Sequence, residues 1–257
     1  MKKILLLNKR GGETPLEALN RFRKGDLRYK DVKMTYAGRL DPMASGLLLV
    51  LVGEETKNKE KYLKLDKEYK FEILFGFATD TYDILGKVIS VSLRQDLSGK
   101  MKLVEKKIKD NIKFFTGKFI QKYPLYSSKT VKGKQLFEYA RKGVDVEVPE
   151  KEVSVKELKF FKLKKINNIK LLTNIEKRIK KVKGDFRQNE ILKIWRKKLN
   201  PVQGRASHKK SEFFLASFEI KCGSGTYVRS IVHSLGERIS IPGLAFSIKR
   251  TKIGKWG

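Results

Sequence analysis

The sequence predicts an α+β fold in which helices flank a mixed, mostly antiparallel central sheet. Stretches with the character of strands are mixed with stretches of helical periodicity, and the two kinds do not alternate regularly along the chain. The chain has 257 residues, of which 40% are hydrophobic, so it can bury a real core as one domain with an elaboration. We see no internal repeat or low-complexity linker that would divide it.

Local signals place the elements in order. The apolar run 4–7 is too short for a signal peptide and indicates a first strand, while Thr14-Pro15 begins a helix with proline in its first turn. The apolar run 46–52 is typical of a buried strand. We expect strands at 1–8, 46–52, 68–77, 87–91, 144–148, 153–161, 213–222 and 248–253, and helices at 15–24, 54–65, 101–111 (with Leu103, Ile108 and Ile112 inward), 135–141 and 227–239. The stretch 117–134 is expected to be irregular, polar and basic.

Charge limits the classes of partner. The chain has 59 Lys and Arg against 28 Asp and Glu, a formal net charge of +31, which favours a polyanionic partner. Nucleic acid is favoured over a membrane surface because the charge is spread along the chain and no basic amphipathic anchor or transmembrane run accompanies it. One cysteine and two histidines exclude a disulfide framework and argue against a metal site, so we expect a cytoplasmic, reduced protein without metal.

Residues 159–210 form a basic segment. They include 18 Lys and Arg and three acidic residues, so 18 − 3 = +15, about half of the net charge. Apolar residues with helical spacing predict two helices, separated at Gly184 and closed by Pro201: Ile175, Ile179 and Val182 in the first, and Leu192, Trp195 and Leu199 in the second.

Three side chains are candidates for chemistry. Asp41 precedes the most apolar strand; Asp-Pro is a common turn, but a carboxylate held there could act as a nucleophile if a cation keeps it ionised. Arg229 lies where a glycine turn enters a helix, the unfavourable end of the helix dipole for a cation, so an external carboxylate partner is plausible alongside a phosphate contact or a solvated position. Tyr69 begins a strand and could equally be a core or edge tyrosine.

Residues 121–134 interleave lysines with aromatic residues. Lysines can contact phosphates while Tyr126 is available for stacking, so the segment fits an RNA-gripping loop as well as an ordinary basic surface loop. No glycine-rich phosphate loop, Ser/His/Asp pattern or metal-ligand spacing is evident.

Taken together, these segments resemble the TruB family of tRNA pseudouridine synthases. Six segments match the family's motifs in the same order along the chain: 9–14, 38–48 around Asp41, 67–69 with 79–86, 126–143, 222–230 and 246–251. The resemblance covers about 1–158 and 212–254, and the basic segment between them has no recognised counterpart.

The resemblance implies a pseudouridine synthase catalytic domain over 1–257, with a thumb-like RNA-binding loop at about 117–143 and a basic helical insertion at about 159–210. It implies the isomerisation of uridine to pseudouridine in tRNA, at uridine 55 of the T-loop, by base flipping and attack by Asp41. Arg229 would pair with Asp41, and Tyr69 would stack on the base and help remove its C5 proton. The residues expected to bind substrate are Tyr36, Tyr126, Lys129, Tyr227 and Ile248. No cofactor is implied, and we expect a monomer whose partner is the tRNA T-arm stem-loop.

Three departures stand out. Arg10 replaces a proline of the first motif, and Tyr36 replaces the family's usual histidine five residues before the nucleophile. No C-terminal PUA-type domain is expected after the last motif, and we hypothesise that the basic insertion supplies electrostatic affinity for RNA instead.

Two other functions fit parts of the sequence. A non-catalytic tRNA-binding or tRNA-folding chaperone fits the composition equally well, but has no need of Asp41, Tyr69 and Arg229 together. A related pseudouridine synthase acting on ribosomal RNA would share the Arg-Leu-Asp core but not the thumb-like segment.

Overall fold

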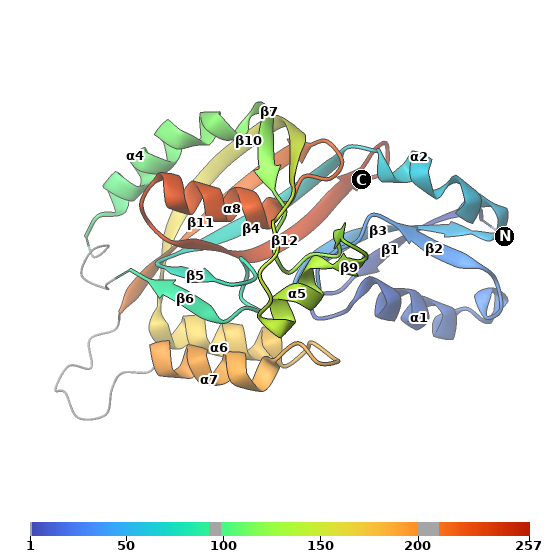
Figure 1. Cartoon of the computed structure of the whole chain (residues 1–257), viewed down its shortest axis with the longest axis horizontal. Helices are drawn as coiled ribbons and strands as arrows, with labels where there is room; N and C mark the ends of the chain where they lie inside the picture. The colour runs from blue at the N-terminus through green and yellow to red at the C-terminus, as the bar shows by residue number, and fades with distance from the viewer. Residues whose placement is uncertain (1, 93–98, 200–210) are drawn as a thin grey trace.

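An eight-stranded mixed sheet organises the structure, a computed structural model that describes residues 2–92, 99–199 and 211–257 (Figure 1). Its strand order is β1-β3-β12-β4-β11-β10-β7, with β2 paired to β3. The pairs are antiparallel except β3 with β12, which run parallel over two residue pairs. The predicted fold class is confirmed. The strands are β1 (Ile4–Lys9), β2 (Met34–Ala37), β3 (Ser45–Val52), β4 (Lys67–Phe75), β7 (Gly117–Lys122), β10 (Glu150–Asn167), β11 (Glu212–Cys222) and β12 (Gly243–Ile253).

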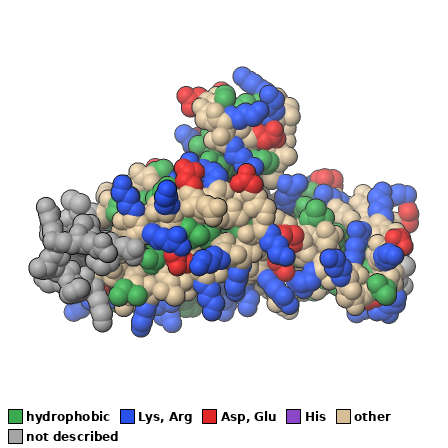
Figure 2. Space-filling view, turned by 90° about the horizontal axis from the view of Figure 1, so that it is seen from below, with side chains coloured by type: hydrophobic (Ala, Val, Ile, Leu, Met, Phe, Trp, Pro, Cys, Tyr) green, Lys and Arg blue, Asp and Glu red, His purple; other side chains and the backbone are tan. Residues whose placement is uncertain are grey.

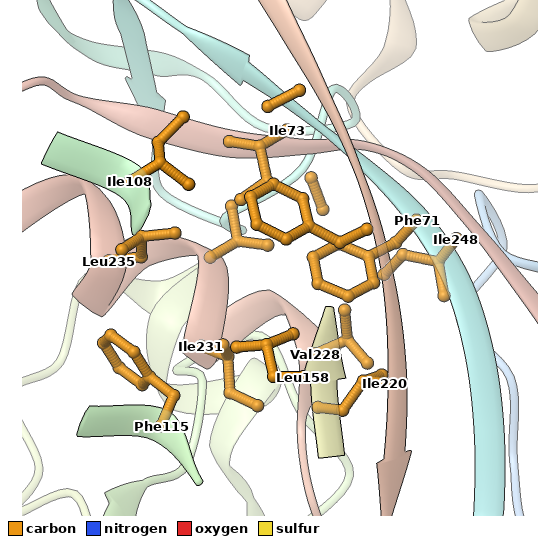
Figure 3. Close-up of a cluster of buried hydrophobic side chains, with 14 of the residues drawn as sticks. Phe71, Ile73, Ile108, Phe115, Leu158, Ile220, Val228, Ile231, Leu235 and Ile248 are labelled. Atoms are coloured by element: carbon orange, nitrogen blue, oxygen red, sulfur yellow. The ribbon is translucent and has the colours of Figure 1, made fainter. Parts of the chain in front are cut away.

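Helices α4 (Met101–Asn111) and α8 (Val228–Arg238) cover one face of the sheet (Figure 1). Figure 3 shows the apolar cluster between them and the strands, which includes Ile108 and Ile231. The expectation that Leu103 points inward is wrong, since its side chain is 49% exposed. Val104 and Ile108, one turn apart, form the buried stripe, and Leu103 lies about 100° around the helix from Val104.

The two helices of the basic segment form a layer of the fold. Helices α6 (Asn168–Ile179) and α7 (Gln188–Leu199), here called the α6–α7 hairpin, cover the opposite face of the sheet. The helical spacing is confirmed, and Trp195 is fully buried, with its Nε1 donating to the carbonyl of Ile84 at 3.1 Å. Residues 159–167 belong to β10, so the hairpin begins later than the charge pattern indicates. Pro201, which is predicted to close the second helix, lies outside the described residues.

Smaller elements complete the molecule. Helix α1 (Pro15–Gly25) begins with a capping box at Thr14, as the Thr-Pro signal indicates. The remaining elements are η1 (Leu27–Tyr29), η2 (Gly53–Asn58), α2 (Lys59–Leu63), β5 (Phe77–Thr79), β6 (Val88–Val91), η3 (Ile112–Phe115), β8 (Thr130–Val131), β9 (Lys134–Gln135) and α5 (Leu136–Lys142). No helix among the described residues is long and apolar enough to cross a membrane.

Two expected segments differ from the structure. The stretch 117–134 is not irregular throughout, because residues 117–122 form edge strand β7 and 130–135 contain the β8–β9 hairpin. β7 is difficult to recognise because most of its side chains are exposed. Residues 144–148 alternate in sequence but form no strand, since alternation predicts an extended chain and a strand also needs a partner. We call residues 123–143, which follow β7 and precede β10, the thumb segment.

Candidate active site

Asp41 lies in the loop that joins β2 to β3, and a buried lysine holds that loop. The Lys9 side chain is fully buried and donates to the carbonyls of Ala44 at 2.5 Å, Arg10 at 3.0 Å and Pro42 at 3.4 Å. Burial lowers the pKa of Lys9 to about 8, although the negative charge of Asp41 opposes that shift. On one side of the Asp41 loop, hydrogen bonds from the Lys9 ammonium to carbonyls therefore take the place of hydrogen bonds between backbone groups.

Arg250, from β12, holds the other side of the loop. Its side chain is 1% exposed, and it donates from Nε to the carbonyl of Leu47 at 2.7 Å and from Nη2 to that of Gly38 at 3.1 Å. Gly46 pairs with Arg250 where β3 and β12 run parallel, with a φ of 103°, and a Cβ there would collide with the Arg250 backbone. Glycine thus permits the close approach that brings β12 against the start of β3.

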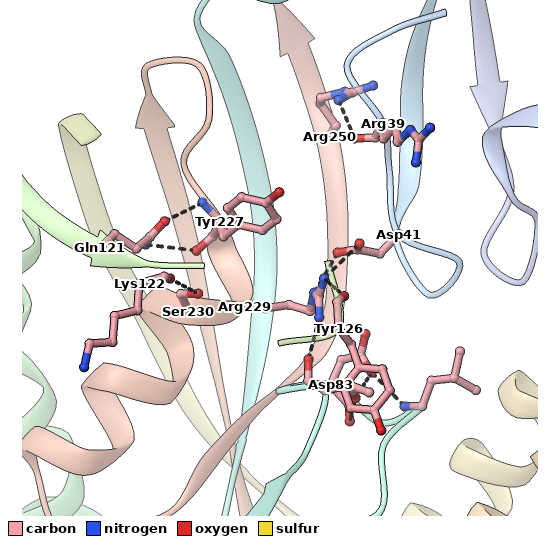
Figure 4. Close-up of polar contacts among 12 residues, drawn as sticks. Arg39, Asp41, Asp83, Gln121, Lys122, Tyr126, Tyr227, Arg229, Ser230 and Arg250 are labelled. Atoms are coloured by element: carbon pink, nitrogen blue, oxygen red, sulfur yellow. Dashed lines mark hydrogen bonds and ion pairs between the residues drawn. The ribbon is translucent and has the colours of Figure 1, made fainter. Parts of the chain in front are cut away.

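Arg229 is the cation beside Asp41 (Figure 4). It donates from Nε to Asp41 Oδ2 at 2.7 Å and from Nη2 to Oδ1 at 3.0 Å, a two-point contact. The same guanidinium donates to the carbonyls of Thr81 at 2.6 Å and Tyr126 at 3.2 Å. The Arg229 side chain is 3% exposed and that of Asp41 is 37% exposed, so the carboxylate has a fixed counter-ion on one side and an open side.

A second carboxylate, Asp83, lies buried near this pair. Burial raises the pKa of Asp83, while the positive charge of Arg229 opposes the shift. Its Oδ1 accepts from the Thr81 hydroxyl at 2.8 Å and from the Leu85 amide at 2.9 Å. Burial alone would lower the pKa of Arg229, but Asp41 and Asp83 raise it, so the guanidinium remains protonated.

Tyr69 lies on β4 directly opposite Arg250 on β12. Burial raises the pKa of its phenol, with Arg250 acting in the opposite direction and Asp41 adding to the rise. Ile248, two residues before Arg250, is buried in the apolar cluster between the sheet and helices α4 and α8, and Tyr69 packs against the same cluster. The structure thus places the predicted stacking residue and the predicted pocket residue on the same face of the sheet.

Tyr227 immediately precedes α8. Gln121 holds its backbone, accepting from the Tyr227 amide at 2.8 Å and donating to its carbonyl at 3.2 Å. The rings of Tyr227 and Tyr123 meet edge to face, 5.4 Å apart. Burial raises the pKa of the Tyr227 phenol, and the charge of Asp41 adds to this.

The thumb segment contacts the site through Tyr126. Its carbonyl accepts from Arg229, while Arg39, two residues before Asp41, donates to the Ser128 hydroxyl at 2.6 Å. Lys129 is exposed, with its Nζ 5.4 Å from the centre of the Tyr123 ring. Contact of Lys129 with RNA stays a prediction.

Tyr36 lies on β2, five residues before Asp41. Its half-buried ring contacts an apolar cluster between α1 and β3 that contains Leu7, Ala18, Leu19, Leu48 and Val50. Its contact with RNA remains a prediction.

Three polar side chains of the site were not predicted from the sequence. Lys9, Asp83 and Arg250 all fall inside the matched motifs, but their roles depend on burial against distant carbonyls and charges. Within the described ranges, no group of three His, Cys, Asp or Glu side chains could hold a metal ion.

Two buried lysines predict a rise in stability with pH. Burial lowers the pKa of both Lys9 and Lys67 to about 8, and an unfolded chain would hold those protons to about 10.5. Above pH 8 the unfolded chain therefore binds more protons, and each lysine should add about 1 kcal/mol of stability by pH 9. The thermal midpoint should rise between these pH values.

The Cys222 thiol sets the upper limit of the pH range over which stability rises. Burial raises the pKa of its thiol to about 11, so above pH 9 it opposes the effect of the lysines. Lys9→Met should remove about half of the rise, whereas Lys102→Met, at an exposed position of α4, should leave it intact. If the stability of Lys9→Met rose with pH as much as that of the unaltered protein, the lowered pKa of Lys9 would not be a cause of the rise.

The fold of this chain occurs in other proteins of known structure. Two solved structures share it: one described as the crystal structure of a Cbf5-Nop10-Gar1 complex, with TM-score 0.55 and 18% identity, and one described as an H/ACA RNP bound to a substrate RNA containing 2'-deoxyuridine, with TM-score 0.52 and 17% identity. Each covers 98% of this chain, which spans 49% and 48% of theirs.

Sequence comparison identifies the family. The family model for the TruB family pseudouridylate synthase N-terminal domain matches residues 26–186. The tRNA pseudouridine synthase B of Ligilactobacillus salivarius is 32% identical over 99% of this chain, and that of Caldanaerobacter subterraneus subsp. tengcongensis is 32% identical over 86%. This chain belongs to the TruB family of pseudouridylate synthases. It spans 68% of the length of the first of these relatives and 59% of the second.

Proposed function

We propose that this chain converts uridine to pseudouridine in tRNA, at uridine 55 of the T-loop, with Asp41 as the nucleophile. The observation that carries the proposal is the two-point contact of a buried Arg229 with a carboxylate that keeps one side open. A protein that only bound RNA would gain nothing from presenting a carboxylate toward a phosphate backbone. The family relatives named tRNA pseudouridine synthase B support the choice of tRNA.

The reaction is an isomerisation, so it needs no oxidant or reductant. Asp41 attacks the sugar C1′ or the base C6, and the glycosidic C–N bond breaks. The detached uracil turns and its C5 bonds to C1′, which displaces Asp41 if the attack was at C1′; if the attack was at C6, the bond from Asp41 to C6 breaks afterwards. C5 then loses its proton and N1 gains one, which restores the conjugated base. Tyr69 stacks on the base and helps remove that proton, and burial, which raises the pKa of its phenol, keeps the stacked ring neutral.

The target base must leave its stack to reach Asp41. Flipping costs a few kcal/mol, and less in a loop than in a duplex. Tyr227 and Ile248 line the pocket for the flipped base, while Tyr126 and Lys129 of the thumb segment contact the RNA. The partner is the T-arm stem-loop of tRNA, and the enzyme acts as a monomer in the cytoplasm.

Tritium release tests the function directly. A T-arm stem-loop carrying 5-tritiated uridine should release the tritium of one uridine per RNA when the protein is added. The same RNA with cytidine at position 55 should release none. Release from both RNAs would contradict the assignment to uridine 55, and release from neither would favour a binding protein or tRNA-folding chaperone.

The α6–α7 hairpin should contribute to RNA binding by charge. In Figure 2, which views the molecule from the side of α6 and α7, Lys and Arg side chains are spread over the visible face. Lys193→Gln with Lys197→Gln, two exposed positions one turn apart on α7, should weaken tRNA binding. The slope of log K against log salt should fall by roughly 0.7–0.9 for each phosphate that the variant no longer neutralises.

The matched control lies on the other side of the sheet. Lys102→Gln with Lys106→Gln removes the same charge at the same spacing from α4. Equal effects of the two double variants would mean that the hairpin has no special role. Deletion of the whole hairpin cannot test this point, because it would expose the core that Trp195 fills.

A further inference from the structure

The turn of the α6–α7 hairpin reaches the active-site loops. Arg187, in that turn, donates from Nη1 to Asp80 Oδ2 at 2.8 Å and from Nη2 to Asp80 Oδ1 at 3.4 Å. Its guanidinium carbon also lies 4.4 Å from the centre of the Tyr126 ring. The side chains of Arg187 and Asp80 are only 20% and 21% exposed, so the contact is shielded from solvent.

Both contacts lie next to the carbonyls that orient Arg229. Asp80 is the neighbour of Thr81, and its Oδ1 also accepts from the Lys87 amide at 2.8 Å, which closes the loop 79–87. Arg229 donates to the carbonyl of Thr81 and to that of Tyr126. One arginine of the hairpin thus joins the two segments whose carbonyls aim the guanidinium at Asp41.

A second contact joins the hairpin turn to the thumb segment. Arg141, on α5, donates to the carbonyl of Asp185 at 2.8 Å. Its guanidinium carbon lies 5.4 Å from the centre of the Phe137 ring and 5.9 Å from that of Phe186. The turn is therefore fixed to the thumb segment through two arginines.

The backbone of Arg187 supports a functional role. Its φ is 61°, in the left-handed region that glycine tolerates best and a long side chain adopts at a cost. Strained positions persist where the side chain has a role, and the side chain here pairs with Asp80 and covers Tyr126.

We propose that Arg187 is a positioning residue for the Asp41–Arg229 pair. It holds the loop 79–87 and the thumb segment together, so that the carbonyls of Thr81 and Tyr126 keep Arg229 directed at Asp41. The α6–α7 hairpin then serves catalysis as well as RNA binding. This inference rests on the proposed function for its effect on rate, and on geometry alone for its effect on the loops.

Single-turnover kinetics test the effect on rate. With saturating enzyme on the T-arm stem-loop, Arg187→Met should slow tritium release by roughly tenfold, because a small displacement of a catalytic group is costly. Arg187→Lys, which keeps the charge without the two-point contact, should recover part of the rate. Arg28→Met, an exposed arginine outside the hairpin that pairs with Asp26, should react like the unaltered protein.

Salt titration separates positioning from direct RNA contact. If Arg187 positions Arg229, the salt dependence of tRNA binding should be the same in Arg187→Met and in the unaltered protein. A slope reduced by about one, with a saturating rate that does not change, would overturn the proposal in favour of a phosphate contact. An unchanged rate with an unchanged slope would also overturn it.

Hydrogen exchange provides a readout that needs no turnover. The amides of residues 79–87 and 123–128 should exchange faster in Arg187→Met than in Arg28→Met. Arg187→Gly, which relieves the left-handed strain, should show the same faster exchange without a lower thermal midpoint. If the unaltered protein releases no tritium, the proposed function fails while exchange still decides the positioning role. Unchanged exchange in both Arg187 variants would refute that role.

Discussion

Asp41→Asn is expected to abolish pseudouridine formation, with a loss on the order of 10⁴-fold or more in the single-turnover rate. Asparagine keeps the size of the side chain and an oxygen that can accept from Arg229, so the fold and the loop should persist. The amide cannot form the bond to carbon that the proposed reaction requires. Tritium release measures the loss, and filter binding should show tRNA affinity within about twofold of the unaltered protein.

Asp110→Asn provides the matched control for this substitution. Asp110 is an exposed aspartate near the end of α4, and the same change there should leave the rate intact. Substantial release by Asp41→Asn, above about 1% of the normal rate, would assign the nucleophile elsewhere. A failure of Asp41→Asn to bind tRNA would show that the substitution disturbs more than the chemistry.

Arg229→Lys is expected to slow the reaction by roughly 10²–10³-fold while the protein remains folded. Lysine keeps the positive charge, but a compact ammonium cannot maintain the fixed, forked contacts to Asp41, Thr81 and Tyr126. Arg238→Lys, at the other end of α8, is the matched control and should retain its activity.

Arg229→Ala should also unfold more easily. Buried Asp83 would lose the cation that opposes the rise of its pKa, and the carbonyls of Thr81 and Tyr126 would lose a donor, which costs about 1–3 kcal/mol. Urea unfolding followed by circular dichroism measures this change. A variant with near-normal stability and rate would show that the arginine is not the counter-ion of Asp41.

The local parts of the fold could be predicted from sequence because their signals are local. The Thr14-Pro15 start of α1 and the apolar spacing of α6 and α7 depend on neighbours a few residues apart. The place of Arg229 at a helix start left a carboxylate partner open beside a phosphate contact or a solvated position, and the structure pairs it with Asp41. The residues of the matched motifs are distant from one another in sequence, and in the structure they lie together in one site.

Features that depend on distant partners could not be predicted. Residues 144–148 have a strand pattern without a neighbouring strand, while β7 has a neighbour without a clear pattern. In a chain with so many lysines and arginines, nothing in the sequence distinguishes Lys9 and Arg250 from surface cations, yet both are buried around the Asp41 loop. The charge of the α6–α7 hairpin is evident from the sequence. That the hairpin covers one face of the sheet and buries apolar side chains there is evident only from the structure.

The position of β12 has a consequence for biosynthesis. β12 pairs with both β3 and β4, which precede it by most of the chain, and it separates them in the sheet. Until it emerges from the ribosome, the strand that follows Asp41 and the strand that carries Tyr69 have no ladder between them. A nascent chain already exposes basic surface to the RNA around it, but it cannot yet assemble the reactive centre. Late insertion of one central strand therefore delays activity until residues 243–253 have been translated and have left the ribosome.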